Sequence, residues 1–194
     1  MAGCSDQPAS AAEKYQCSLK EHALGHAAAA LTLCEQAAHL GHPEAMCTLG
    51  AHYLAGEGVP ISSSHAAGWF MKAADAGDSK AQCNLAVLLL HGIGIPKDEI
   101  AARQWCEASA RNGQADGEYN LALMCLRGVG GISDRAEAEK WCASAAAKGH
   151  TEAAASLRQL REAVKVYEDV GRGRVTKAPA PDTHVLLTEF EVVD

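Results

Sequence analysis

The sequence repeats itself every 36 residues, and this periodicity constrains the fold more than any other feature. The positions that keep this step are Leu49, Leu85, Leu121 and Leu157; Trp69, Trp105 and Trp141; the pairs Gly56/Gly58, Gly92/Gly94 and Gly128/Gly130; and Gly41, Gly77, Gly113 and Gly149. Columns of different residue types share one register, which composition bias alone does not produce. Such repeats are typical of arrays in which each unit buries its apolar side only against its neighbours.

Within one repeat, the spacing predicts a helical hairpin. Ala45, Leu49 and Tyr53 recur every fourth residue and form one buried helical stripe. Gly56 is suited to the left-handed conformation that ends a helix. The column Ser62, Asp98 and Asp134 consists of residues that cap a helix N-terminus. The repeat therefore reads as a first helix, a glycine loop, a second helix and a tight glycine turn.

Hydrophobic residues make up 48% of the chain but aromatic residues only 5%, which favours closely packed helices over strands. We predict an all-α fold, a right-handed α-α superhelix or solenoid of helix-turn-helix repeats with a C-terminal capping helix. The predicted segments are a disordered N-terminus (1–8), a degenerate first repeat (9–43), three repeats (44–79, 80–115 and 116–151), a capping helix (152–171), and a linker with an apolar tail (172–194).

The two ends of the array depart from the pattern. In the degenerate first repeat Glu13 stands where leucine is expected, and Lys20 replaces the loop glycine, so this repeat is interpreted as an N-terminal cap. At the other end, residues 185–193 are apolar with two interleaved glutamates. Exposed apolar surface of this kind predicts a segment that docks either in the groove of the array or on a partner.

Charge and apolar patterning exclude several classes of partner. The formal net charge is −7, and the basic cluster around Arg172 and Lys177 is short, which argues against nucleic-acid binding. No apolar stretch approaches the roughly 20 residues that span a bilayer. The first twenty residues contain no Arg and no apolar run, so we expect no targeting segment and a cytoplasmic location.

The motif Glu44-Ala45-x-x-x-Leu49-Gly50-x-x-Tyr53-x-x-Gly56-x-Gly58-Val59-Pro60, followed by Trp69-Phe70-x-x-Ala73-Ala74-x-x-Gly77, closely resembles the SEL-1-like repeat family. Two further copies match over residues 80–113 and 116–149, and the resemblance covers residues 27–160. The resemblance implies a superhelical relative of tetratricopeptide arrays that serves as an adaptor. It names no partner, and fold alone does not determine function.

In related arrays the first helix of each repeat lines a concave binding face, and the same positions are carried over to this chain. They are Glu44, Cys47, Ala51, Leu54, Lys80, Cys83, Val87, Leu90, His91, Asp116, Tyr119, Leu123, Leu126 and Arg127. This face would suit a peptide or an amphipathic helix, with His91, Tyr119 and Arg127 as polar contacts. Alternatively, the leucines belong to the core between repeats.

The eight cysteines allow two readings. Most of them replace core-type residues at fixed repeat positions, as buried free thiols do. Alternatively, Cys17 with Cys34 and Cys125 with Cys142 form disulfides within repeats, although Cys47 competes for Cys34. Such disulfides would indicate a redox-compartment assembly factor, possibly with a cofactor. Eight free thiols in denaturant without reductant would exclude them, and four or fewer would support them.

No residue pattern indicates a catalytic site or a cofactor. The Gly-x-Gly loops lack the preceding strand and the later acidic residue of a nucleotide site, so they are interpreted as turns. His22 and His26 are four residues apart, but Gly25 between them weakens the helix that a metal pair would need. His42 and His150 are predicted to be solvated turn residues. A hydrolase on the repeat scaffold remains a minor alternative, without a nameable nucleophile.

Overall fold

The computed structural model of the chain describes residues 10–171, with side chains as far as residue 162. Its helices are α1 (Ala11–Ala23), α2 (Ala27–His39), α3 (Pro43–Ala55), α4 (Ser63–Asp75), α5 (Ser79–His91), α6 (Glu99–Arg111), α7 (Ala115–Arg127), α8 (Arg135–Ala147) and α9 (Thr151–Gly171). All regular elements within this range are helices, which confirms the predicted all-α solenoid. The predictions for residues 1–8 and for the segment 172–194 lie outside the described residues.

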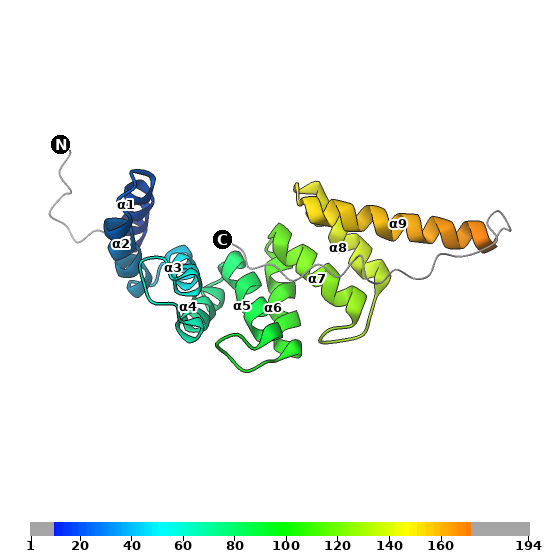
Figure 1. Cartoon of the computed structure of the whole chain (residues 1–194), viewed down its shortest axis with the longest axis horizontal. Helices are drawn as coiled ribbons and strands as arrows, with labels where there is room; N and C mark the ends of the chain where they lie inside the picture. Colours follow the sequence, from blue (N-terminus) through cyan, green and yellow to red (C-terminus); the bar gives the residue numbers. More distant parts are fainter. Residues whose placement is uncertain (1–9, 172–194) are drawn as a thin grey trace.

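The helices pack in sequence order as hairpins. Helices α1 and α2, α3 and α4, α5 and α6, and α7 and α8 form four hairpins, and each hairpin packs on the next through its second helix. Figure 1 shows the resulting elongated array, with α9 extending from its C-terminal end. Because contacts run only between neighbours, the structure has the one-dimensional organisation of a solenoid.

Helix ends follow the predicted capping residues. Gly56 ends α3 in the left-handed conformation with φ of 75°. The side chains of Ser62 and Asp98 cap α4 and α6, and Asp134 accepts a hydrogen bond of 2.9 Å from the backbone N–H of Glu137. These caps satisfy backbone donors that the first turn of a helix leaves unpaired.

The glycine pairs of the loops have two separate structural roles. The first glycine of each pair ends a helix, whereas the second lies against the preceding repeat. A Cβ added at Gly94 would collide with the backbone of Ser63 at the start of α4, and one at Gly130 would collide with the backbone oxygen of Glu99 in α6. The Gly-x-Gly pattern therefore serves loop packing between repeats, as well as the predicted turn.

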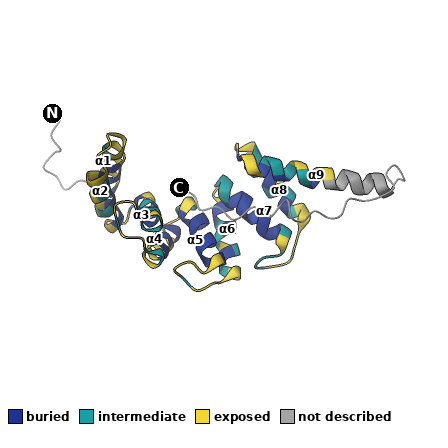
Figure 2. Ribbon diagram, viewed as in Figure 1, coloured by how far each residue is buried: buried dark blue, intermediate teal, exposed yellow. Residues whose placement is uncertain are grey.

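The core is continuous from α3 to α9 and has a smaller counterpart at the N-terminus. The most deeply buried position of the repeat is the one directly after the tryptophan position. Cys34, Phe70, Cys106 and Cys142 occupy this position, and each is at most 1% exposed. The tryptophans themselves are only half-buried and pack against the two clusters. Figure 2 shows buried residues concentrated along α5 and α7, with exposed residues in the loops.

Candidate protein-binding face

The first helices of the three repeats approach one another more closely than the second helices do. Helix α5 contacts both α3 and α7, whereas α4, α6 and α8 make no contacts of comparable extent with one another in the described part of the chain. In a curved array, elements on the inside of the curve are closer together than those outside. This geometry indicates that α3, α5 and α7 form the inner side; we call their inward-facing surface the inner face.

The fourteen residues predicted for this face differ in exposure. Those with exposed side chains are Glu44, Lys80, His91 and Arg127. Those that are half-buried are Ala51, Leu54, Asp116 and Leu126. Those that are buried are Cys47, Cys83, Val87, Leu90, Tyr119 and Leu123. The inner face therefore combines charged residues that reach solvent with a largely buried apolar layer beneath them.

The buried members take part in contacts between repeats. The Tyr119 hydroxyl lies 3.3 Å from the hydroxyl of Ser156 in α9, and the Asn120 side chain donates a 3.3 Å hydrogen bond to the sulfur of Cys83. Leu90 belongs to the main core, while Leu54 and Leu126 pack against it and keep partial exposure. Leu90 is therefore a core residue, as the alternative prediction stated for these leucines. Leu54 and Leu126 are only half-buried.

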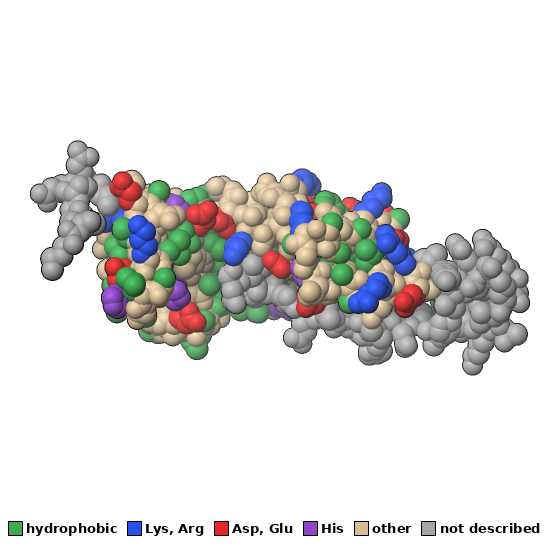
Figure 3. Space-filling model, turned by 90° about the horizontal axis from the view of Figure 1, so that it is seen from above, with side chains coloured by type: hydrophobic (Ala, Val, Ile, Leu, Met, Phe, Trp, Pro, Cys, Tyr) green, Lys and Arg blue, Asp and Glu red, His purple; other side chains and the backbone are tan. Residues whose placement is uncertain are grey.

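The charged side chains of the inner helices lie near the helix ends. His91 and Arg127 are the last residues of α5 and α7, one repeat apart, while Lys80 is the second residue of α5. The helix dipole favours the cation of Arg127 at the C-terminus of α7. Figure 3 shows one side of the molecule, where Lys and Arg side chains gather mainly toward the C-terminal helices and are interspersed with acidic groups.

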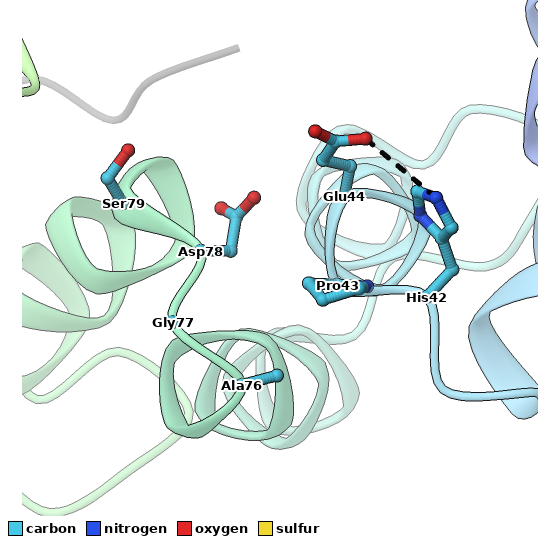
Figure 4. A pocket seen from close by; sticks show the side chains of 7 residues that line it. All are labelled: His42, Pro43, Glu44, Ala76, Gly77, Asp78 and Ser79. Atoms are coloured by element: carbon cyan, nitrogen blue, oxygen red, sulfur yellow. Dashed lines mark ion pairs between the residues drawn. The ribbon is translucent and has the colours of Figure 1, made fainter. Parts of the chain in front are cut away.

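An open pocket of about 380 Å³ lies beside the starts of α3 and α5. It is lined by His42, Pro43, Glu44, Ala76, Gly77, Asp78 and Ser79. Figure 4 shows the carboxylates of Glu44 and Asp78 at this pocket, with His42 paired to Glu44 across 3.9 Å. Asp78 also caps α5, since it accepts a 2.7 Å hydrogen bond from the Ala81 N–H. The pocket adds acidic groups to the edge of the inner face.

Two histidines have roles that the sequence prediction missed. The prediction of a solvated turn residue is wrong for His150, which is 9% exposed and lies 4.6 Å from the Tyr119 ring between ring centroids. Its Nδ1 atom accepts a hydrogen bond from the Ala153 N–H, and His42 accepts one from the Ala45 N–H. Both histidines are therefore N-terminal caps. Both histidines occupy the same position of the 36-residue repeat as Asp78, and aspartate commonly caps helices. This shared position could have indicated their capping role.

The sequence analysis also missed an ion pair between a buried carboxylate and an exposed lysine. Glu118 of α7 is 3% exposed, and its carboxylate accepts hydrogen bonds of 2.8 Å from both Lys148 and Ser144. Lys148 additionally donates to the Gly113 backbone oxygen at 2.8 Å. These contacts connect the turn after α6 to the end of α8. Removing Lys148 would leave the buried Glu118 carboxylate without its cation, so loss of this one partner should destabilise the junction.

The seven cysteines within the described residues are free thiols. Cys17, Cys34, Cys125 and Cys142 are all unbridged, as are Cys47, Cys83 and Cys106. Burial raises the pKa of Cys34, Cys125 and Cys142 to about 11 and that of Cys83 to about 12. A thiol with a raised pKa stays protonated at neutral pH and is a poor nucleophile. These buried thiols are therefore suited to packing.

Among residues 10–162 no three His, Cys, Asp or Glu side chains come together as metal ligands. Gly25 separates α1 from α2, so His22 and His26 do not share one helix, and His26 instead contacts Glu21 at 2.8 Å. None of the helices in the described part combines the length and the apolar character needed to cross a membrane.

The fold is therefore an α-solenoid of stacked helical hairpins. The Sel1 repeat matches three consecutive segments, 43–78, 79–114 and 115–150, which together cover more than half of the sequence. The chain therefore belongs to the Sel1 repeat family, whose members generally act as scaffolds for protein–protein interaction. Each matched segment begins one residue before the repeat counted from the sequence.

Two solved structures resemble this chain. One is a protective antigen of uropathogenic Escherichia coli with an SLR fold, which is 28% identical with a TM-score of 0.67 and matches 72% of this chain. This chain spans only 31% of that protein. The other is a Sel1 repeat protein from Oxalobacter formigenes, 31% identical with a TM-score of 0.61, where the match covers 66% of this chain and 97% of that one. No curated protein matches the sequence.

Proposed function

We propose that the protein is a non-catalytic adaptor that binds a peptide or an amphipathic helix of another protein along its inner face. The observation that carries this proposal is two rows of exposed side chains on successive inner helices. Glu44 and Lys80 lie near the starts of α3 and α5, and His91 and Arg127 lie at the ends of α5 and α7. Repeat arrays use such surfaces because stacked units present equivalent positions at regular intervals. A bound segment would contact several repeats at once.

The surface chemistry supports a protein ligand. The half-buried leucines Leu54 and Leu126 offer apolar contacts, and the charged residues around them offer hydrogen bonds and orientation. Interfaces with this composition derive affinity from partly buried apolar anchors and specificity from the polar rim. The free, protonated thiols favour a protein that operates in a reducing compartment over the disulfide-linked alternative.

The test is a pair of matched double variants. A peptide that binds the whole chain is first selected from a random library, and its affinity is measured for Leu54→Gln/Arg127→Gln. The control, Met71→Gln/Arg111→Gln, likewise replaces one apolar residue and one cation, here on α4 and α6, where Met71 and Arg111 are exposed. We expect the inner-face variant to bind about tenfold more weakly and the control to stay within about twofold.

Thermal unfolding of both variants checks that the array remains folded. Equal weakening by the two variants, or selection of no peptide at all, would contradict the proposal. An apolar anchor and a cation are replaced in each variant, so a general change in solubility or net charge cannot mimic the expected difference.

A further inference from the structure

The inner side of α5 is shielded from water to an unusual extent. All ten residues of Ala81–Leu90 are buried, and ten residues make almost three helical turns, so every side of the helix is included. Helices α3 and α7 flank α5, while α4 and α6 pack behind it. On α3, the corresponding inner residues Ala51 and Leu54 keep partial exposure. The inner side of α5 is therefore as inaccessible to solvent as the sides that pack against other helices.

This surface is apolar in the middle and carries basic side chains at its edges, with the acidic Glu44 and Asp78 also present at the edge where α3 and α5 begin. Val87 and Leu90 of α5 and Leu123 of α7 are buried at inner positions. Lys80 lies toward the start of α5, and His91 and Arg127 end α5 and α7. A segment that fits here needs apolar side chains for the centre and carboxylates for the edge formed by His91 and Arg127.

The last residues of the same chain have this composition. Residues 185–194 read Val-Leu-Leu-Thr-Glu-Phe-Glu-Val-Val-Asp, so apolar residues are combined with three carboxylates and no cation. In an extended segment, Glu189 and Glu191 would point to one side and Phe190 and Val192 to the other. Such a segment could bury its apolar side chains while its carboxylates meet the basic edge.

The connecting chain is long enough for this contact. Helix α9 has 21 residues and is therefore about 31 Å long at 1.5 Å per residue. The thirteen residues 172–184 can extend over roughly 43 Å at about 3.3 Å per residue. The linker can thus return along the whole length of α9 to reach α7. A tethered segment also has a high effective concentration at its site.

We propose that residues 185–193 are an intramolecular ligand of the inner face, bound across α5 and α7 at the site that a partner peptide uses. The inference rests on the proposed function and specifies which kind of peptide the inner face binds. It assigns the partner class as an extended peptide that alternates acidic and apolar residues, and it makes the tail a competitor that the partner must displace. A bound tail lowers the affinity for such partners without changing the fold.

Photo-crosslinking of the full chain tests the location of the tail. Benzoylphenylalanine replaces Phe190, and the crosslinked peptides are identified by mass spectrometry after irradiation at low protein concentration. We expect a crosslink within one chain to α5 or α7. Crosslinks that join two chains, or that lie on α4, α6 or α8, would overturn the proposal, and so would the absence of any crosslink.

A competition measurement tests the regulatory consequence. A fluorescent peptide of residues 183–194 is titrated against the wild-type chain and against Phe190→Glu, in which the internal segment is weakened. We expect the peptide to bind the variant at least about tenfold more tightly, and Arg127→Gln in the same background to reduce that gain. The control Met71→Glu, on the exposed side of α4, should leave peptide affinity unchanged.

Equal affinity for wild type and Phe190→Glu would refute internal competition. This result leaves the proposed function intact when the library-selected peptide still distinguishes the inner-face variant from its control. Failure of both measurements would instead remove the inner face as a binding site, so the two proposals can be separated.

Discussion

The N-terminal hairpin, α1–α2, and the central hairpin, α5–α6, have helices of equal length but very different cores. All four helices contain 13 residues. Helix α5 buries ten of its residues, whereas α1 buries only Tyr15 and Ser18. The connection between α1 and α2 comprises only residues 24–26, compared with 92–98 in the central hairpin. A terminal hairpin has one neighbour, while a central hairpin has two.

Polar contacts supplement the small core of the N-terminal hairpin. Ser10 and Glu13 form a reciprocal capping box, in which Glu13 is bound to the N–H of Ser10 at 2.8 Å. Lys14 donates a 2.6 Å hydrogen bond to Gln36, which joins α1 to α2. Glu13, a departure from the leucine column, therefore has a structural role of its own. In this hairpin the capped start of α1 and the contact between Lys14 and Gln36 therefore supplement a small apolar core.

The largest expected effect comes from shortening a central core leucine. Leu121→Ala removes a side chain that is 1% exposed, and should lower the free energy of unfolding by about 3–4 kcal/mol. Leu24→Ala, at a residue 67% exposed beside α1, should change it by less than about 0.5 kcal/mol. Urea unfolding followed by circular dichroism measures both. Similar losses would contradict the difference between the two regions.

A second comparison uses glycines with positive φ. Gly130→Ala introduces both an unfavourable φ of 66° and a collision with the Glu99 backbone, and should destabilise the array by about 2 kcal/mol or more. Gly41→Ala, with φ of 90° and open space around the new Cβ, should cost about 1 kcal/mol. Equal destabilisation in thermal and urea unfolding would show that loop packing between repeats contributes little.

The third prediction concerns alkaline pH. Burial raises the pKa of Cys142 to about 11, above the ordinary value of 9. Above pH 9 the unfolded chain loses this proton while the folded chain retains it, so stability is complete below pH 9 and declines as the pH rises toward 11. The free energy of unfolding of the wild type should fall between pH 8 and pH 10, and Cys142→Ala should make this fall smaller by about 1 kcal/mol.

Urea unfolding at a series of pH values measures the alkaline decline. Leu121→Ala serves as the control, because it weakens the core without removing a thiol and should therefore leave the pH dependence unchanged. A Cys142→Ala variant with the same pH dependence as the wild type would contradict the assigned role of the buried thiol.

The smallest expected effect is confined to the N-terminal hairpin. Ser10→Ala removes the side chain that accepts a hydrogen bond from the Glu13 N–H, and should destabilise α1 by about 0.5–1 kcal/mol. Hydrogen exchange should accelerate in α1 and remain unchanged in α5. Gln16→Ala, an exposed change within α1, is the control. Faster exchange throughout the array would mean that the terminal hairpin is not a separate cooperative unit.

The repeat spacing was sufficient to predict the helical hairpins, their order and most of their ends. Gly56 and Asp98 act through local backbone chemistry, which depends on a few adjacent residues and can therefore be read from the sequence. The same spacing placed most of the cysteines at core-type positions, and Cys106 and Cys142 are indeed fully buried. Helical periodicity gives the direction of a side chain from its helix axis, and this information is local.

Only the tertiary structure decided which inner positions reach solvent. Ala51 and Val87 occupy the same repeat position, yet Ala51 is half-buried and Val87 is buried. His150 was likewise buried by Tyr119, which lies far from it in the sequence. These outcomes depend on how closely neighbouring hairpins approach, and contacts such as that of Gly130 with Glu99 contribute to this spacing. The periodicity of one helix contains no information about that distance.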